Sequence, residues 1–226
     1  VKQRSLGRTG ITLSEIGLGT VKFGRNTDVK YPEYFRLPSD EEILDLLREA
    51  ATLGINCLDT APAYGDSEHR LGELLPEIEH HFQVITKVGE FYDAVKGSHY
   101  DFSERTIIES VYKSLATLSR EYLDIVLLHS DGNDCVHLEK GALKTLIGLR
   151  EQGLIRAIGL SGKTREGGRV ALDQGADCLM ITFNPNQQNE APLVNIAERY
   201  GAGILVKKAL GSGQITRDID IVFRDL

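Results

Sequence analysis

Four side chains with complementary acid–base chemistry stand at or near the ends of short apolar runs in this sequence. They are a carboxylate, a phenol, an ammonium and an imidazole, contributed by Asp59, Tyr64, Lys87 and His129. Lysine is rarely placed at the end of a buried segment without a partner. Each of the other three residues, taken alone, is as readily explained by capping or packing. The same position in successive runs favours one shared site.

These residue types suit the delivery of a proton to a substrate oxygen. A free tyrosine has a pKa near ~10 and is a poor acid at neutral pH. The ammonium of Lys87 would lower that pKa for Tyr64, and Asp59 would keep the ammonium charged and aimed. His129 would hydrogen-bond a substrate carbonyl oxygen and polarise it. Since no activated serine or cysteine accompanies the set, hydride from a nicotinamide fits as the attacking group.

The elements that must position these side chains alternate between strands and helices. A capping box at Ser39 and Glu42 predicts where the first long helix begins. The strands are mostly apolar on both faces, which is typical of a parallel sheet covered by helices. After a predicted hairpin over residues 3–16, strands are predicted at 16–21, 55–58, 83–88, 123–129, 156–161, 178–183 and 203–209. Helices are predicted from residue 39, at 67–75, from residue 103, and at 139–152, 165–173 and 191–200.

This order predicts an α/β fold of one domain over residues 1–226, a (β/α)8 TIM barrel with an N-terminal β-hairpin. Only seven strands follow the hairpin, so the last β/α unit is expected to be absent or incomplete, with 215–226 ambiguous between strand and helix. A doubly wound open sheet is the alternative. It is disfavoured because Gly17-x-Gly19 lacks a third glycine and Gly211-x-Gly213 comes too late. In a barrel, the carboxyl ends of strands two to four would bring the four side chains into one corner.

The sequence from residue 4 to about 213 resembles the aldo-keto reductase family. The matching motifs are Leu6-Gly7-Arg8-Thr9-Gly10, Gly17-Leu18-Gly19-Thr20, Leu58-Asp59-Thr60-Ala61-x-x-Tyr64-Gly65, Ile85-Thr86-Lys87, Leu128-His129-Ser130 and Ile158-Gly159-Leu160-Ser161. The resemblance implies a barrel that reduces aldehydes or ketones, usually with NADPH. It implies that Tyr64 is the proton donor, that Lys87 and Asp59 tune it, and that His129 orients the carbonyl.

A coenzyme site is also implied by the resemblance. One group of residues matches a first-strand turn, another the carboxamide contact, and a third the loop along the pyrophosphate; these residues are Gly19, Thr20, Val21, Ser161, Lys207, Ala209, Leu210, Gly211 and Ser212. Three positions depart from many family members: Gly162 for asparagine, Met180 for glutamine, and Lys207 for a stacking aromatic. The 2′-phosphate pocket of the family would lie beyond residue 226. NADP(H) is therefore the expected cofactor, with NAD(H) as an alternative.

Composition narrows the classes of partner. The net charge of −7 over 226 residues argues against a nucleic-acid groove or an anionic membrane surface, and a small-molecule carbonyl substrate is expected instead. Cys57, Cys135 and Cys178 are far apart, which favours a reducing, cytoplasmic compartment. No apolar run approaches the ~20 residues that a bilayer requires. The oligomeric state cannot be read from the sequence.

Weaker patterns leave alternatives open. Asp131, Asp134, Cys135 and His137 lie close together, but their spacing fits no recognised metal site, and no metal is expected. The aromatic residues within 31–35 and 91–102 are compatible with local packing or with an apolar pocket mouth. The departures at the coenzyme positions leave a second functional class open, a NAD(P)H-binding sensor or regulatory barrel with little turnover.

Overall fold

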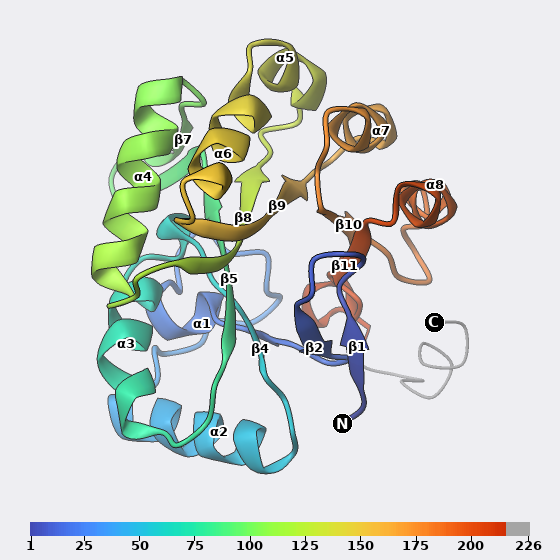
Figure 1. The fold of residues 1–226 in the computed structure, drawn as a ribbon. Coiled ribbons are helices and arrows are strands. Elements are labelled where there is room, and N and C mark those ends of the chain that lie inside the picture. The colour runs from blue at the N-terminus through green and yellow to red at the C-terminus, as the bar shows by residue number, and fades with distance from the viewer. Residues whose placement is uncertain (216–226) are drawn as a thin grey trace.

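A curled sheet of seven parallel strands forms the centre of the chain, seen in a computed structural model that describes residues 1–215 (Figure 1). The strand order is β11-β10-β9-β8-β5-β4-β3, so each strand lies beside its predecessor in the sheet. This order has no reversal, which excludes the doubly wound alternative and gives a partial (β/α)8 barrel. The strands of the sheet are β3 (Leu18–Gly19), β4 (Cys57–Asp59), β5 (Gln83–Val88), β8 (Leu123–His129), β9 (Ile155–Ser161), β10 (Cys178–Thr182) and β11 (Gly203–Lys207).

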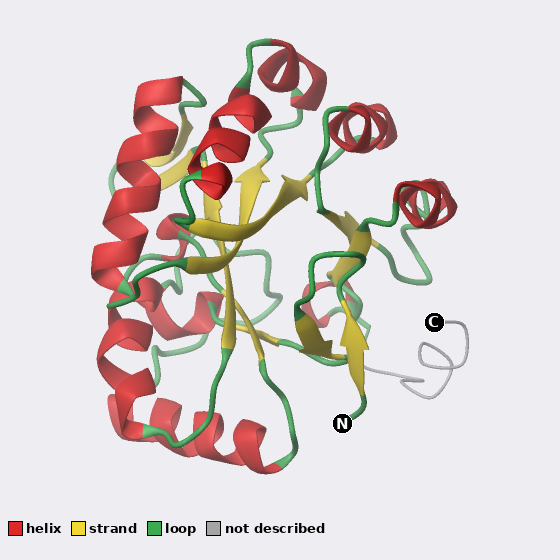
Figure 2. Cartoon of the chain, viewed as in Figure 1, coloured by secondary structure: helices red, strands yellow, loops and turns green. Residues whose placement is uncertain are grey.

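Helices surround the convex side of the sheet in an outer arc, with the strands inside (Figure 2). They are α1 (Val21–Gly24), α2 (Asp40–Thr52), α3 (Ser67–Leu74), α4 (Glu104–Thr117), α5 (Asp134–Glu139), α6 (Ala142–Glu151), α7 (Arg165–Asp173) and α8 (Pro192–Tyr200). Three short 3₁₀ turns complete the described chain: η1 (Pro62–Tyr64), η2 (Leu75–Glu77) and η3 (Gly211–Gly213).

The start of α2 shows how the sequence fixes these elements locally. The Ser39 side chain accepts from the Glu42 backbone N–H, and the Glu42 carboxylate accepts from the Ser39 N–H, as the capping box predicted. Ile43, Leu47 and Ala50 recur at helical spacing and are buried against the sheet.

The apolar core has two parts because strand side chains alternate between the faces of the sheet. The larger part lies between the sheet and the helices. The smaller part fills the inside of the curl, where Ile85 and Leu127 meet Leu6 and Ile11 of the N-terminal hairpin. That hairpin, β1 (Gln3–Ser5) with β2 (Thr12–Ser14), therefore covers the inside of the curl at its amino-terminal end.

Strand register brings the carboxyl ends of the strands to one rim. Asp59 pairs with Ile85, Lys87 with Leu127, and His129 with Ser161 in successive parallel pairs. Side chains that leave the ends of β4, β5, β8 and β9 therefore face a common opening.

The structure differs from the sequence predictions in three places. The helix expected at 139–152 is α6, which begins only at Ala142, after Gly141 with its φ of +90°, and the short helix α5 before it was not predicted. The first strand is only β3, and Val21 already begins α1. A second hairpin, β6 (Glu90–Asp93) with β7 (Gly97–Tyr100), was not predicted. The ambiguous segment falls almost wholly on 216–226, outside the described residues.

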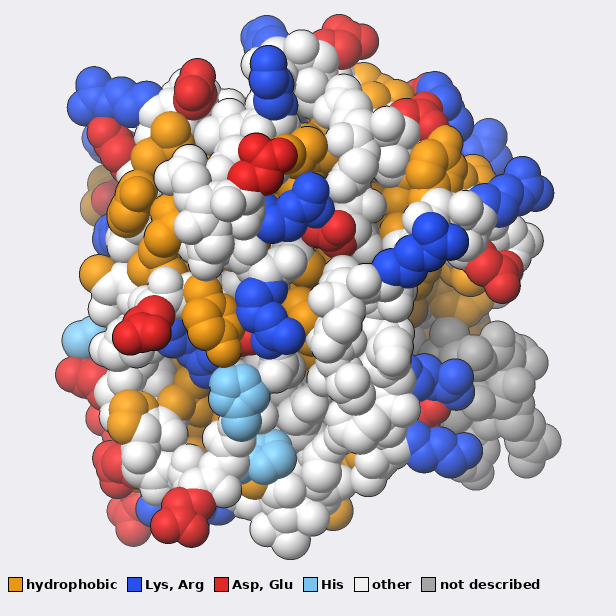
Figure 3. All heavy atoms as spheres, in the orientation of Figure 1, with side chains coloured by type: hydrophobic (Ala, Val, Ile, Leu, Met, Phe, Trp, Pro, Cys, Tyr) orange, Lys and Arg blue, Asp and Glu red, His pale blue; other side chains and the backbone are white. Residues whose placement is uncertain are grey.

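The surface carries acidic and basic side chains interspersed, with hydrophobic side chains in small separate groups on the face shown in Figure 3. No helix among residues 1–215 combines the length and the apolar character that a membrane crossing requires.

Candidate active site

The Lys87 ammonium is the centre of a hydrogen-bonded cluster at the rim. Its Nζ donates to Asp59 Oδ1 at 2.7 Å, to the Thr60 carbonyl oxygen at 2.8 Å, and to the Tyr64 hydroxyl at 3.1 Å. An ammonium has three donors, and all three are engaged. The Lys87 side chain is only 2% exposed, against 25% for Asp59. The ammonium is therefore fixed in position. Its charge is balanced by the Asp59 carboxylate, which is the more exposed of the two groups.

The chain around Tyr64 is held by close backbone packing. Tyr64 is the last residue of η1, which begins at Pro62 shortly after the end of β4, and the Tyr64 N–H donates to the Ala61 carbonyl oxygen at 2.9 Å. Gly65 has a φ of +61°, and a Cβ there would lie 2.2 Å from the Gly24 carbonyl oxygen. A Cβ on Gly24 would in turn lie 2.4 Å from the Tyr64 carbonyl oxygen. Both glycines are needed for α1 to pack against η1 and hold the phenol over Lys87.

The electrostatics of the cluster keep the phenol protonated. Burial raises the pKa of Tyr64 to about 12, and Lys87 opposes this shift without reversing it. The lowering by Lys87 that the sequence predicted is present, but loss of solvation outweighs it, so the expected net decrease of the Tyr64 pKa was wrong. Burial alone would lower the pKa of Lys87, but contact with Asp59 and Tyr64 holds that pKa above its ordinary value. A neutral phenol thus lies beside a charged ammonium.

His129, at the end of β8, lies across from this cluster. Its ring is edge-on to the Tyr64 ring, with centroids 6.1 Å apart. Its Nδ1 lies 2.9 Å from Glu90 Oε2 on the unpredicted hairpin, although the N–H direction is poorly aligned with that oxygen. Ser98 Oγ donates to the other Glu90 oxygen at 2.7 Å. The rim therefore brings all four predicted side chains to one corner and adds Glu90, which sequence reasoning missed.

The β6–β7 hairpin is anchored from the other side of the opening. Tyr92 donates to Asp28 Oδ2 at 3.1 Å and lies 2.6 Å from Thr27 Oγ1. The Arg25 guanidinium carbon sits 3.5 Å from the centroid of the Tyr92 ring. These contacts join the hairpin to the loop that follows α1.

The predicted coenzyme side is organised by a second lysine, Lys207, which is partly buried. Lys207 Nζ donates to Ser161 Oγ at 3.0 Å and to the Gly162 carbonyl oxygen at 2.6 Å. Burial lowers the pKa of Lys207 to about 8. Met180 is buried among the apolar residues inside the curl. Lys207 thus connects the end of β11 to the loop after β9, at the positions where this chain departs from the family pattern.

The remaining predicted coenzyme residues divide between open and buried positions. Gly19 is exposed, and a Cβ built there would meet no atom within 4 Å. Thr20 is fully buried, and its hydroxyl donates to the Asp59 carbonyl at 3.0 Å, which makes it a brace for β4. Val21 is partly buried in α1. The turn after β11 holds Ala209, Leu210, Gly211 and Ser212, with positive φ at Gly211 and Ser212.

The donors on this side fit a dinucleotide. Lys207 and Ser161 offer an ammonium and a hydroxyl, and the exposed edge at Gly19 leaves room above the cluster. The pKa of Lys208 is lowered by partial burial and by the neighbouring charges of Lys30 and Lys163. Positive charge therefore gathers near the carboxyl ends of the last strands of an otherwise acidic chain, which suits phosphate groups.

Other polar clusters do not form comparable sites. Among residues 1–215, no group of three or more His, Cys, Asp or Glu side chains is arranged to hold a metal. Asp134 accepts from the Thr164 N–H at 2.9 Å and from its hydroxyl at 2.6 Å, so it braces the loop after β9. Cys57, Cys135 and Cys178 are free thiols.

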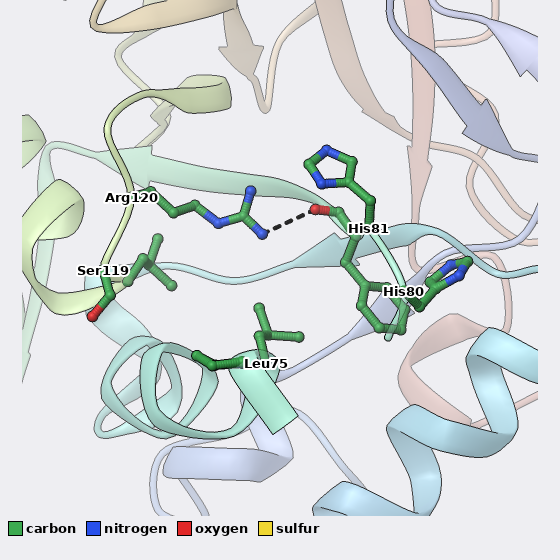
Figure 4. Close-up of a pocket in the computed structure, with 8 residues that line it drawn as sticks. Leu75, His80, His81, Ser119 and Arg120 are labelled. Carbon is green, nitrogen blue, oxygen red and sulfur yellow. Dashed lines mark hydrogen bonds between the residues drawn. The ribbon is translucent and has the colours of Figure 1, made fainter. Parts of the chain in front are cut away.

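One surface hollow lies at the opposite end of the sheet from this site. It is bordered by the segment before β5 and the turn after α4, with His80, His81 and Arg120 around it (Figure 4). Arg120 is already committed, donating to the Phe82 carbonyl oxygen at 3.0 Å and to Asp124 at 3.0 Å. This hollow therefore offers few free polar groups to a ligand. The side chains that could converge on a ligand lie at the rim, at the other end of the sheet.

The family is decided by a match along nearly the whole chain. The sequence model of the Aldo/keto reductase family matches residues 15–222. The chain belongs to this family. The aldo-keto reductase assignment predicted from the motifs is thus confirmed, and so is the barrel class. Members of this family are, in general, oxidoreductases that reduce carbonyl groups.

Individual aldo-keto reductases and related proteins support the same assignment. PA4992 of Pseudomonas aeruginosa, assigned to the aldo-keto reductases, is 50% identical with a TM-score of 0.84 over 94% of this chain and 80% of its own. The uncharacterized oxidoreductase YqkF of Bacillus subtilis is 31% identical over 71% of this chain and 49% of its own. The NADH-specific methylglyoxal reductase of Escherichia coli is 29% identical over 96% of this chain and 71% of its own. The chain thus spans about half the length of YqkF.

Proposed function

We propose that this protein reduces an aldehyde or ketone to the alcohol with NAD(P)H, using Tyr64 as the proton donor. The reaction consumes one carbonyl compound, one reduced nicotinamide and one proton, and yields one alcohol and one oxidised nicotinamide. The observation that carries the proposal is the Lys87 ammonium, whose three donors hold Asp59, Thr60 and the Tyr64 hydroxyl in one fixed cluster.

Each residue of the cluster has a separate task in this proposal. The reduced nicotinamide, when bound, supplies a hydride to the carbonyl carbon. The Tyr64 hydroxyl gives its proton to the carbonyl oxygen as negative charge develops there. Lys87, 3.1 Å away, stabilises the phenolate that Tyr64 becomes, and Asp59 keeps that ammonium charged. The high pKa of resting Tyr64 ensures that the proton is present when substrate arrives.

The coenzyme is held, in this proposal, along the ends of β9 and β11. Ser161 and Lys207 would offer polar contacts to the nicotinamide end, and the turn over residues 209–212 would hold the pyrophosphate. Gly19 leaves space at the ring, and the role of Thr20 is to brace β4. NADP(H) is the preferred form, with NAD(H) as the alternative that the name of the Escherichia coli relative exemplifies.

Turnover of a small aldehyde panel tests this function directly. NADPH or NADH oxidation should depend on the aldehyde and yield one alcohol per coenzyme consumed. The competing class, a coenzyme-binding sensor, has one specific observation in its favour: Lys207 already engages Ser161 and Gly162. Fluorescence quenching on coenzyme binding without consumption of any aldehyde would support the sensor and contradict the reductase.

A further inference from the structure

The contact between His129 and Glu90 restricts which proton the imidazole can offer. Nδ1 of His129 lies 2.9 Å from Glu90 Oε2, in a setting where that nitrogen is fully buried. A lone pair on Nδ1 would face a carboxylate lone pair at this distance, which is repulsive. A proton on Nδ1 removes this repulsion, although its N–H is not well aligned with Oε2.

Two protonation states of the pair satisfy this condition at ordinary pH. In the first, neutral His129 carries its proton on Nδ1, and Nε2 presents a lone pair. In the second, an additional proton makes an imidazolium, and Nε2 becomes a donor. A substrate carbonyl oxygen accepts hydrogen bonds, so only the second state can polarise it. Within residues 1–215, Nε2 makes no hydrogen bond of its own.

Charged groups on the neighbouring elements influence how readily His129 takes up the additional proton. Burial lowers the pKa of His129, Glu90 opposes that shift, and Lys87 and Lys207 add to it. Glu90 is itself buried, which disfavours its charge, but His129 and Ser98 outweigh this and lower its pKa to about 2. The charged or titratable side chains that act on the pair are Tyr64 (η1), Lys87 (β5), Tyr100 (β7) and Lys207 (β11). Asp59 (β4) acts in turn on Tyr64, and Asp131 (after β8) and Arg25 (after α1) act on Tyr100.

We propose that Glu90 is a positioning residue that holds His129 with Nδ1 toward its carboxylate, so that Nε2 donates to a substrate carbonyl only when the pair carries a second proton. This inference rests on the proposed function and deepens it. The hairpin thus sets the acidity at which carbonyl reduction is fastest. Because the second proton binds below the ordinary histidine range near ~6.5, reduction should accelerate as pH falls through that region.

Nitrogen-15 NMR of the free, full-length protein tests the protonation directly. The His129 signal is assigned by its loss in His129→Gln. At neutral pH the wild-type ring should show the Nδ1–H tautomer, and titration should give a pKa below the ordinary value. In Glu90→Gln that pKa should fall by about 1 unit, since an attractive charge is lost. A wild-type ring in the Nε2–H tautomer, or an unchanged pKa in Glu90→Gln, would overturn the proposal.

Kinetics connect this protonation to the reaction. The limb of the pH profile on which kcat/KM for aldehyde reduction declines as pH rises should follow the His129 pKa and move with it in Glu90→Gln. Ser98→Ala, which removes one hydrogen bond to the carboxylate, should move the limb less. The matched control is Glu109→Gln, an exposed residue on α4 paired with Arg105, which should leave the limb unchanged. A limb that stays fixed in Glu90→Gln would show a merely structural role.

The two proposals fail in different ways. If wild-type protein consumes no aldehyde, the proposed function fails, whereas the tautomer and pKa of His129 still decide the state of the pair. If reduction proceeds and depends on Tyr64 but not on Glu90, only the inference about Glu90 is lost. The tautomer measurement on wild-type protein requires no folded Glu90 variant.

Discussion

The two sides of the rim differ in how their lysines are satisfied. Lys87 donates to Asp59, Thr60 and Tyr64, and these side chains match the family motifs. Lys207 donates to Ser161 and to the Gly162 carbonyl oxygen, where the chain departs from the family pattern. The first lysine keeps a pKa above its ordinary value, while burial lowers the second to about 8. On the proton-transfer side, the lysine therefore stays charged and hydrogen-bonded at neutral pH. On the coenzyme side, the charge of the lysine changes close to neutral pH.

The largest effect is expected when the phenol of the assembled side is removed. Tyr64→Phe should reduce the kcat of aldehyde reduction by about 10³-fold, the scale of a lost general acid. The melting temperature should change little, because the ring and its packing remain. Steady-state kinetics with matched thermal unfolding would check both. Undiminished turnover in this variant would show that Tyr64 is not the proton donor and that the cluster around Lys87 does not carry out the proton transfer.

A smaller loss of activity is expected when the lysine of that side becomes neutral. Lys87→Met should lower kcat by about 10²-fold, because Tyr64 loses the charge that stabilises its phenolate. The coenzyme dissociation constant should stay within a few-fold of wild type. If instead coenzyme binding fails and kcat is maintained, the division of labour between the two sides is wrong.

The second lysine should influence binding in a pH-dependent way. Lys207 is charged below about pH 8 and becomes neutral as pH rises through that value. Attraction for an anionic dinucleotide is therefore present below that pH and is lost above it. NADPH affinity, followed by fluorescence from pH 7 to 9, should weaken several-fold in the wild type and remain nearly flat in Lys207→Met. Equal slopes in both proteins would show that Lys207 has no part in coenzyme binding.

The smallest effect belongs to a residue on neither side. Ser39→Ala removes the capping box of α2 and should lower the free energy of unfolding by about 1 kcal/mol. Activity per folded molecule should not change. Chemical denaturation and an aldehyde assay on the same samples provide the baseline against which the rim variants are compared. A loss of activity larger than the loss of folded protein would mean that α2 is coupled to the rim.

Much of the fold could be predicted because local signals agree with the tertiary structure. Helix α2 begins directly after Ser39, as the capping box predicts, and strand β5 covers the predicted apolar run from Gln83 to Val88. The β6–β7 hairpin was missed because its strands are short and mix polar with aromatic side chains, and its turn depends on a positive φ at Gly97. The later start of α6, at Ala142, was missed because a glycine within a helical pattern is also compatible with a continuous helix, and the positive φ of Gly141 cannot be read from the sequence.

The candidate site was predictable only in part, for a related reason. Asp59, Lys87 and His129 follow apolar strands, so their position at the rim can be inferred from strand order alone. Glu90 gives no such signal, since its contact with His129 depends on the path of an unpredicted hairpin. The pKa of Tyr64 was also beyond the sequence, because the depth of burial outweighs the neighbouring charge.

Tyr92 joins two segments that are far apart in the chain, the β6–β7 hairpin and the loop at residues 25–28. Because the Tyr92 phenol contacts a guanidinium and a carboxylate of that loop, outward movement of either segment alone would break these contacts. Admission of a bulky molecule would require both to yield together. Substitutions at Asp28 should consequently alter which substrates enter, even though that residue lies apart from the reacting groups.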